Sequence, residues 1–283
     1  MPTNDPDSFA TRRITVIGAG NMGAALVGGL VAAGHAPDAL TVADPGDAAR
    51  RRASERFGVA GTADNATAAL TAELAVLAVK PQTLAPLLRE LAPQLTAATT
   101  PPALLSVAAG VTTARLASWA GAVEIYRAMP NTPALIGAGI SGAYGGAVPG
   151  PRRDLVDYVL GAVGDVVWLD RESDFDALTA LSGSGPAYVF ALAEAMAAAG
   201  VSLGLAPQLA RQLAETTVAG AGRLLAGSED DAATLRARVT SPGGTTAAAL
   251  ERFDTLGFEG VVAAAMEAAA ARSQELGTAT GDT

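Results

Sequence analysis

A glycine-rich turn near the start of the chain constrains its fold more than any other feature of the sequence. Residues 18–23 have the pattern G-x-G-x-x-G, directly after an apolar run at residues 13–17 and before an apolar helical stretch at residues 22–33. Glycines at this spacing allow a tight strand-to-helix turn, which brings a helix N-terminus close to a phosphate group. Asp44 closes the next predicted strand, 21 residues beyond the last glycine, where a carboxylate can reach ribose hydroxyls. We therefore predict a dinucleotide-binding turn, with a plain tight turn as the alternative.

Strands and helices alternate along the first 170 residues. The predicted strands are residues 13–17, 40–43, 74–79, 104–108, 123–128, 139–144 and 166–169, with helices after the turn, after Asp44, from Pro81 and over 152–163. Such alternation implies right-handed βαβ crossovers and a largely parallel, doubly wound sheet. We therefore expect an α/β fold, with a Rossmann-type dinucleotide-binding domain over residues 11–170.

Beyond residue 170, apolar residues recur at intervals of three and four, which is the period of an α-helix. The predicted helices are residues 174–181, 186–201, 207–225, 232–239, 245–252 and 258–274. Several are apolar around most of their circumference, notably residues 187–199, and a domain of roughly 100 residues cannot bury so much apolar surface alone. We expect residues 171–276 to form an all-α domain that buries this surface in a homodimer.

The composition limits the kinds of partner that the chain can bind and the cellular compartment in which we expect it. The formal net charge is −9, without a long basic run, which argues against nucleic acid as a partner. The chain has no cysteine, so disulfides, thiolate nucleophiles and cysteine-bound metals are excluded. No stretch resembles a membrane span, and the polar residues 1–10 lack the apolar core of a secretory leader. We expect a cytoplasmic protein without a metal site.

The single histidine and the single lysine stand apart from the other ionisable residues. His35 follows the first predicted helix, far in sequence from the other candidates, and we expect it on the surface. Without cysteine and without a catalytic histidine, the usual triads and zinc sites cannot be built. Lys80 ends a predicted buried strand, at the edge where open α/β sheets bind ligands. It could contact a cofactor phosphate or ribose or a substrate carboxylate, and an exposed lysine without a role is equally consistent.

The residues that follow the second predicted strand give conflicting indications about the dinucleotide. Asp44 favours NAD, because a carboxylate repels a 2′-phosphate. The arginines from Arg50 onward could instead accept that phosphate. For Arg51 and Arg56 a solvated helix face is at least as consistent. The choice between NADH and NADPH therefore stays open.

Two segments rich in glycine and hydroxyl side chains precede predicted helices of the second domain. They are residues 181–188, LSGSGPAY, and residues 239–246, VTSPGGTT. A helix start preceded by glycines offers free backbone N–H groups and a positive dipole end, which suit a carboxylate or a phosphate. Helix capping by Ser and Thr is the equally consistent alternative.

Five motifs, in this order, resemble those of the pyrroline-5-carboxylate reductase family. Besides the turn at 18–23, they are residues 78–81 (AVKP), 127–133 (RAMPNTP), 180–188 (ALSGSGPAY) and 239–246 (VTSPGGTT). The last three together are highly specific, and the resemblance spans nearly the whole chain. It implies reduction of the ring C=N of 1-pyrroline-5-carboxylate by NADH or NADPH to give L-proline, the last step of proline biosynthesis. It also implies an interlocked helical dimer and often a decamer of five dimers.

The resemblance further implies roles for individual residues. The substrate-binding positions are Ser241, Gly243, Gly244, Thr245 and Thr246, and the cofactor-binding positions are Gly18, Gly20, Asn21, Met22, Gly23, Asp44, Asn65, Ala78, Val79, Lys80 and Pro81. As catalytic residues it implies Thr246, near the substrate nitrogen, and Glu229 in support. Asn65 matches a position near the cofactor ribose, and residues 80–81 a position near the nicotinamide. Arg238 stands where relatives often carry a polar amide, so a cofactor contact there stays open.

An imine substrate fits a chain without catalytic histidine or cysteine, because an imine nitrogen can arrive already protonated. The protein then supplies the approach geometry and a fixed anchor for the carboxylate. Two other functions compete with this one. A 3-hydroxyacid dehydrogenase-like oxidoreductase would need a lysine in the helical domain, but no lysine follows Lys80. A non-catalytic dinucleotide-sensing protein would not need two small-residue segments facing a substrate.

Overall fold

The computed structural model of the protein describes residues 9–146 and 150–279. Residues 1–8 lie outside the described residues. They make up most of the N-terminal segment for which the sequence predicts no secretory leader. The chain divides into two compact units. The first extends to Gly183 and includes the chain again from Ala270, and the second is Ser184–Ala269. The functional boundary after residue 170 stays a prediction.

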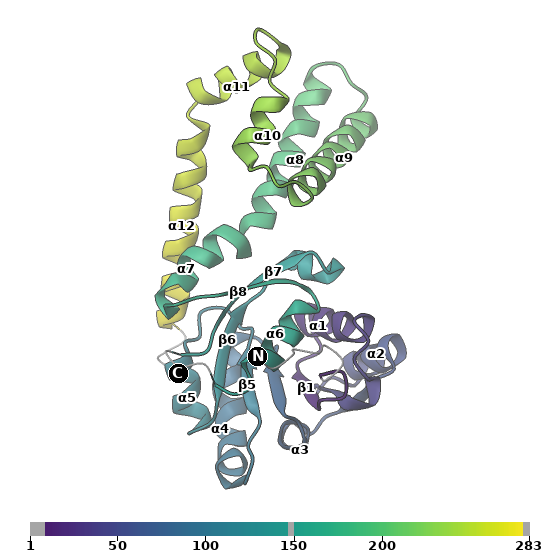
Figure 1. Ribbon diagram of the computed structural model, residues 1–283, viewed down its shortest axis with the longest axis vertical. Helices are drawn as coiled ribbons and strands as arrows, with labels where there is room; N and C mark the ends of the chain where they lie inside the picture. The colour runs from purple at the N-terminus through teal and green to yellow at the C-terminus, as the bar shows by residue number, and fades with distance from the viewer. Residues whose placement is uncertain (1–8, 147–149, 280–283) are drawn as a thin grey trace. The chain divides into compact units, whose positions relative to one another are not determined.

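An eight-stranded sheet forms the centre of the first unit (Figure 1). Its strands are β1 (Ile14–Ile17), β2 (Leu40–Ala43), β3 (Ala60–Thr62), β4 (Leu74–Leu77), β5 (Ala103–Ser106), β6 (Ile125–Met129), β7 (Gly139–Tyr144) and β8 (Gly164–Trp168). The strand order is β3-β2-β1-β4-β5-β6-β7-β8, and only β6 and β7 pair antiparallel among these described strands. From β1 the chain adds β2 and β3 on one side and then returns to add β4 on the other side of β1. Open α/β sheets bind ligands at such a reversal of the strand order. The predicted, largely parallel sheet is confirmed.

Helices cover both faces of this sheet, with a separate apolar core under each set. One set is α1 (Asn21–Ala32), α2 (Asp47–Phe57) and α6 (Arg153–Gly161), and the other is α3 (Asn65–Thr71), α4 (Pro81–Ala97) and α5 (Thr113–Ala120). Leu74 and Val76 of β4 belong to the first core, whereas Leu77 belongs to the second. Because successive strand side chains point to opposite faces, a strand that is apolar throughout is buried on both. The doubly wound arrangement is confirmed.

Several elements of the first unit differ from the prediction. Strand β4 ends at Leu77 rather than at Val79, and its last contact is the bond from the N–H of Ala78 to the carbonyl of Ile17 (2.8 Å). Strand β3 was not predicted, because Ala60–Thr62 is three residues long and contains no large apolar side chain. The short helices α3 and α5 were not predicted either. In the described part of the chain, 3₁₀ turns join several of the elements, namely η2 (Pro37–Ala39), η3 (Thr132–Ile136) and η4 (Glu172–Asp174).

His35 is buried, so its predicted surface position is wrong. The residue is 1% exposed, and its Nδ1 lies 3.3 Å from the hydroxyl of Tyr158 on α6. Its Nε2 is buried without a hydrogen-bond partner among the described residues. Burial lowers the pKa of His35 below its usual value, because a low-dielectric environment disfavours the charged imidazolium. The ring is therefore held neutral at neutral pH.

The second unit is all-helical, as predicted. It contains α8 (Gly185–Ser202), α9 (Pro207–Ala226), α10 (Ala232–Arg238), α11 (Thr245–Thr255) and the first part of α12 (Phe258–Ala279). Helices α8 and α9 lie side by side (Figure 1). Gly200 permits their close approach, because a Cβ there would lie 3.2 Å from the Cβ of Ala210. No helix of the described residues is long and apolar enough to cross a membrane.

The helices of the second unit expose large apolar side chains. Every residue of α8 is described, and none of them is buried. The exposed apolar residues include Val189, Phe190, Leu192, Met196, Leu209, Leu213, Leu224, Val261 and Val262. Many large apolar side chains exposed on the same few helices are typical of an interaction site. The surface agrees with the prediction that this part of the chain needs a partner to cover it.

The C-terminal part of α12 belongs to the first unit. Ser273 Oγ donates a hydrogen bond to Asp176 Oδ1 at 2.7 Å, and Arg115 Nη1 donates to the carbonyl of Gly277 at 2.8 Å. These hydrogen bonds explain why the first compact unit contains two separate stretches of the sequence. The predicted end of this helix, at residue 274, lies five residues before the observed end.

Candidate functional site

The glycine turn packs against the chain that follows β4. Gly18 has a φ of +103°, and a Cβ there would lie 2.7 Å from the carbonyl oxygen of Ala78. A Cβ on Gly23 would overlap the carbonyl oxygen of Gly18. At Gly20, in contrast, nothing lies within 4 Å of such an atom. Gly18 and Gly23 thus allow the chain to fold this way, whereas Gly20 leaves open space beside the start of α1.

The start of α1 carries unused hydrogen-bond donors. Gly20 is the N-cap, and its carbonyl accepts the N–H of Ala24 at 2.8 Å. The N–H groups of Asn21, Met22 and Gly23 have no partner among the described residues. Free N–H groups at the positive end of a helix suit a diphosphate. These residues therefore fit a dinucleotide.

Asp44 links the glycine turn to the loop after β2. Its Oδ2 accepts the N–H of Ala19 at 2.8 Å, and its Oδ1 accepts the N–H of Gly46 at 2.7 Å. The side chain is half-buried. A carboxylate oxygen has a second lone pair, so each oxygen can still accept another hydrogen bond. The carboxylate of Asp44 thus has a fixed position beside the glycine turn and keeps acceptor capacity there.

Asn65 and Lys80 lie at the same edge of the sheet, beyond the ends of β3 and β4. Asn65 begins α3, and its Oδ1 is buried without a partner among the described residues. A buried acceptor without a hydrogen bond costs free energy unless a ligand or a water molecule donates to it. The unpaired Oδ1 therefore fits the expected contact between Asn65 and the cofactor ribose. Lys80 is exposed and is the N-cap of α4, with Pro81 as its first residue. Because parallel strands end at one edge, the structure brings these residues to the edge that holds the turn and Asp44.

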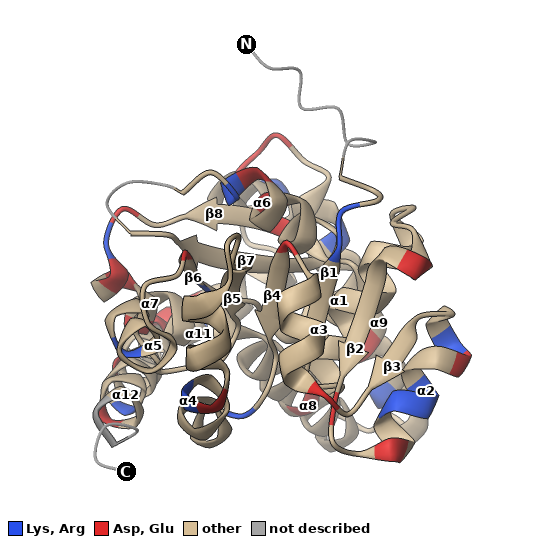
Figure 2. Ribbon diagram, turned by 90° about the horizontal axis from the view of Figure 1, so that it is seen from below, with Lys and Arg blue, Asp and Glu red and all other residues tan. Residues whose placement is uncertain are grey.

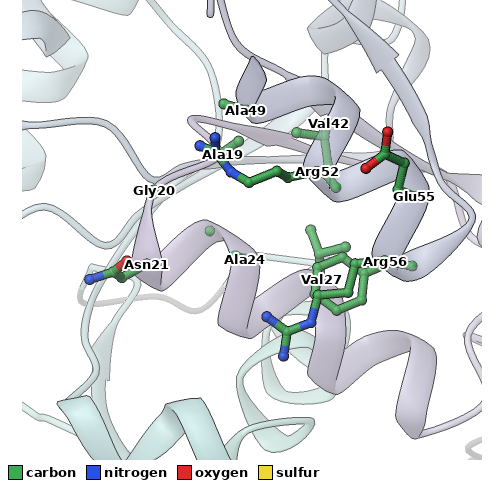
Figure 3. Close-up of a pocket in the computed structure, with 13 residues that line it drawn as sticks. Ala19, Gly20, Asn21, Ala24, Val27, Val42, Ala49, Arg52, Glu55 and Arg56 are labelled. Carbon is green, nitrogen blue, oxygen red and sulfur yellow. The ribbon is translucent and has the colours of Figure 1, made fainter. Parts of the chain in front are cut away.

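A cavity of about 530 Å³ lies between α1 and α2, next to the turn (Figure 3). Its lining includes Ala19, Gly20, Asn21, Val27, Arg52, Glu55, Arg56 and Phe57. The guanidinium of Arg52 points toward Ala19 (Figure 3), and that of Arg56 lies 5.0 Å from the ring centre of Phe57. Blue and red segments of the ribbon mark the charged residues of α2 (Figure 2). The sequence predicts the arginines but does not show which of them faces the turn.

Arg127 of the 127–133 motif is a structural residue. Its Nη1 donates to Glu172 Oε1 at 3.1 Å, and its guanidinium lies 4.0 Å from the ring centre of Phe175. Glu172 also accepts the N–H and the hydroxyl of Thr113, at 2.7 and 2.8 Å. The sequence predicts no role for this motif beyond the family resemblance. The structure shows that it joins β6 to the start of α5 and to η4.

Residues 181–183 of the segment 181–188 belong to a π-helical turn, so the loop predicted there is wrong, whereas α8 begins at Gly185, close to the predicted helix start at Pro186. The predicted helix 174–181 consists of α7 (Phe175–Leu178) followed by a π-helical turn, η5 (Thr179–Gly183). Helix α8 follows after one further residue. Asn131 holds the π-helical turn, because its Nδ2 donates to the carbonyl of Ser182 at 3.2 Å and its Oδ1 accepts the N–H of Ile140 at 3.0 Å. This segment offers no free glycine loop for an anion.

The segment before α11 does remain open. Gly244 is the N-cap of this helix, and no side chain caps it. The N–H of Gly244 donates to the carbonyl of Ser241 at 3.0 Å, and Gly243 has a φ of +69°. The N–H groups of Thr245 and Thr246 have no partner within the described chain. The capping alternative therefore does not hold here, and the start of α11 offers donors for an anion.

Arg238 is paired within the second unit. Its Nη2 donates to Asp230 Oδ1 at 3.0 Å, and its Nη1 contacts the other carboxylate oxygen of the same residue. The pair connects the end of α10 to the loop before it. Glu229, which precedes Asp230 in this loop, is exposed. Arg238 is thus a residue that shapes the chain ahead of the 239–246 segment.

Comparison with known proteins agrees with these features. Residues 172–276 match the family described as pyrroline-5-carboxylate reductase dimerisation, and residues 13–110 match that described as NADP oxidoreductase, coenzyme F420-dependent. The pyrroline-5-carboxylate reductase of Pseudomonas aeruginosa is 44% identical over 271 residues, covering 95% of this chain and 98% of that protein.

Two solved structures resemble the whole chain. A pyrroline-5-carboxylate reductase from Coxiella burnetii has a TM-score of 0.89 at 38% identity and covers 94% of this chain and 98% of its own. The pyrroline carboxylate reductase of Plasmodium falciparum, solved with NADP bound, has a TM-score of 0.79 at 28% identity and covers 95% and 99%.

A doubly wound sheet with a glycine turn, together with a helical second unit, defines the chain as a dinucleotide-dependent oxidoreductase. The high identity over nearly the full length of its relatives narrows that class. The chain belongs to the pyrroline-5-carboxylate reductase family. The resemblance seen in the sequence motifs is confirmed.

Proposed function

We propose that the chain reduces the ring C=N of 1-pyrroline-5-carboxylate with NADH or NADPH and forms L-proline. The observation that carries this proposal is the 44% identity to a pyrroline-5-carboxylate reductase over 95% of the chain. In this proposal residues 11–170 bind the dinucleotide, and residues 171–276 bind the substrate and form the dimer. Within the proposed pathway, this is the final step of proline biosynthesis.

The dinucleotide would bind at the carboxyl edge of the sheet. The N–H groups of residues 21–23 would hold its diphosphate, because they are free and lie at the positive end of α1. Asp44 and Asn65 would bind ribose hydroxyls, and the segment from Ala78 to Pro81 would lie near the nicotinamide. When bound, the dinucleotide supplies a hydride.

The substrate carboxylate would bind at the start of α11. The N–H groups of Thr245 and Thr246 are free to donate, and Ser241, Gly243 and Gly244 form the turn that presents them. The proton already on the imine nitrogen would stay there when the C=N bond is reduced, so that a neutral amine would result. The hydroxyl of Thr246 would hold that nitrogen as its charge disappears, with Glu229 in a supporting role. No protein residue needs to act as a strong acid.

We further propose a homodimer in the cytoplasm, formed through the helical domain. The apolar faces of α8 and α9 support this, because they are exposed in the single chain. Five such dimers would make the decamer that the family resemblance implies.

The function is tested by mixing the purified chain with pyrroline-5-carboxylate and either NADH or NADPH. Oxidation of the dinucleotide with formation of proline supports the proposal. Failure with both dinucleotides, by protein that is folded and binds a dinucleotide, would overturn it. Turnover of a 3-hydroxy acid instead would favour the dehydrogenase alternative, although the last lysine of the chain, Lys80, lies outside the helical unit.

A further inference from the structure

We infer that Asp44 makes this chain select NADH over NADPH. The inference rests on the proposed function, because it assigns the preferred cofactor of that same site. The sequence alone leaves the choice open, since Asp44 and the arginines of α2 favour opposite dinucleotides. The hydrogen bonds around the loop after β2 decide between them.

The carboxylate of Asp44 is fixed by two separate parts of the backbone. Ala19 of the glycine turn donates to Oδ2 at 2.8 Å, and Gly46 of the following loop donates to Oδ1 at 2.7 Å. To turn away from an incoming phosphate, the side chain would have to give up both bonds. A fixed carboxylate at the end of β2 can accept hydrogen bonds from ribose hydroxyls. A phosphorylated 2′ oxygen has no proton to donate, and its negative charge is repelled.

Arg50, the first arginine of α2, is already occupied. Its Nη1 donates to the carbonyl of Asp44 at 2.7 Å and to that of Pro45 at 2.9 Å, and its Nη2 donates to Asp47 Oδ1 at 3.1 Å. The side chain is only 20% exposed. Arg50 therefore holds the loop in the shape that presents Asp44, and the donors of these three hydrogen bonds are directed to the protein rather than to a phosphate.

Arg51 and Arg56 are also engaged. Arg51 forms an ion pair with Asp47, the same carboxylate that binds Arg50. Arg56 lies over the ring of Phe57 on the cavity side of α2. Both contacts are at the surface and are weak, but each gives the guanidinium a partner within the protein.

Arg52 is the remaining competitor. It is exposed, has no partner among the described residues, and points toward Ala19 (Figure 3). An exposed arginine side chain without a partner loses rotamer entropy when it binds a phosphate, whereas the carboxylate of Asp44 is already held by two hydrogen bonds from the backbone. The free-energy balance therefore favours NADH, whose ribose has a free 2′-hydroxyl group. Binding of the 2′-phosphate of NADPH by Arg52 is the alternative that an experiment must test.

The test is a titration of the full-length protein with NADH and with NADPH, followed by the fluorescence of the reduced nicotinamide. We expect NADH to bind about ten-fold more tightly, which corresponds to one hydrogen bond to a charged group. Asp44→Asn should reduce this ratio about ten-fold, chiefly by improving the binding of NADPH. Asp38→Asn is the matched control, because Asp38 is exposed and precedes β2 at its other end. It should leave the ratio within about two-fold.

Equal or tighter binding of NADPH by the natural chain would overturn the inference, and this comparison does not depend on any variant folding. A selective loss of NADPH affinity in Arg52→Gln, with no effect of Asp44→Asn on the ratio, would also overturn it. If the folded chain reduces pyrroline-5-carboxylate with both dinucleotides and shows no preference, only this inference fails. If it binds neither dinucleotide, the proposed function fails with it.

Discussion

Arg127 and Glu172 form an ion pair at 3.1 Å in which both side chains are largely withdrawn from water, with 6% and 20% of their surface exposed. The two residues are far apart in the sequence, on β6 and in η4. The pair fixes the chain just ahead of α7 against the sheet. The 127–133 motif, which the sequence linked to the family, thus has a structural contribution that is separate from ligand binding.

Removing the cation of this pair should destabilise the protein. We expect Arg127→Met to cost about 3 kcal/mol of unfolding free energy, because it leaves Glu172 charged and partly buried. Urea unfolding would measure this loss, and Arg127→Met combined with Glu172→Gln should recover much of it. Arg12→Met is the matched control, since the Arg12–Glu73 pair is 50% and 31% exposed and should contribute below about 1 kcal/mol. Equal losses in the two single variants would contradict the account.

Substitutions at two glycines of the turn should affect stability and dinucleotide binding separately. Gly18→Ala places a Cβ 2.7 Å from the carbonyl of Ala78 at a φ of +103°, so we expect a loss of about 2 kcal/mol or more. Gly20→Ala meets nothing within 4 Å and should keep the melting temperature of the natural chain. It should nevertheless weaken dinucleotide binding, because its methyl group fills the space beside the start of α1. A Gly20→Ala variant with unchanged dinucleotide affinity would place the diphosphate elsewhere.

His35 should make stability depend on pH. Burial lowers its pKa in the folded protein, so the unfolded chain binds the proton more strongly. The stability contributed by neutral His35 is complete above the unfolded pKa of about 6.5 and is lost as the pH falls through the lower, folded pKa. His35→Leu, of similar volume, should therefore lose less stability than the natural chain between pH 7.5 and 5.5. Parallel losses of urea midpoint in the two proteins would show that His35 is not the titrating group.

Thr246 should affect turnover more than folding. We expect Thr246→Ala to lower kcat/KM by about one to two orders of magnitude, as the loss of one transition-state hydrogen bond does. Thr246→Ser should restore most of the activity. Thr255→Ala is the control at the other end of α11, where the hydroxyl donates to the carbonyl of Glu251 at 2.8 Å. An unchanged kcat/KM in Thr246→Ala would make this residue a helix residue only.

The helical unit should hold a dimer together. Phe190 of α8 is 68% exposed in the single chain, and we expect Phe190→Glu to weaken association, because a charge replaces apolar surface at the interface. Light scattering at micromolar concentration should give at least a dimer for the natural chain and a smaller mass for the variant. Val167→Glu on β8, 41% exposed in the other unit, is the control and should keep the natural mass. A monomeric natural chain would refute the dimer.

Much of the fold could be predicted because it depends on local pattern. The bounds of β2 (Leu40–Ala43) and β7 (Gly139–Tyr144) agree with the prediction to the residue, since each is a short run bounded by turn residues. Strand β3 was missed because its stability comes from pairing with β2 rather than from its own side chains. The antiparallel placement of β7 also depends on pairing, which no local pattern reports.

The candidate site was predicted less completely, because it depends on contacts between distant segments. The turn and Asp44 are visible as motifs, but the bond from Ala19 to Asp44 joins residues 25 positions apart. His35 is buried by Tyr158, which lies 123 positions away. Periodicity also does not distinguish a π-helical turn such as η5 (Thr179–Gly183) from a loop that is rich in small residues.

Isotope transfer tests the central claim most directly. The purified chain would be given pyrroline-5-carboxylate with NADH or NADPH carrying deuterium on C4 of the nicotinamide, using each face of the ring in turn. We predict that the label on one face gives proline with one deuterium on the carbon that was part of the C=N bond, in equal amount to the oxidised dinucleotide. The label on the other face should give unlabelled proline and stay on the oxidised dinucleotide. Dinucleotide oxidation without labelled proline from either labelled face, or no oxidation by folded protein that binds the dinucleotide, would contradict the assignment.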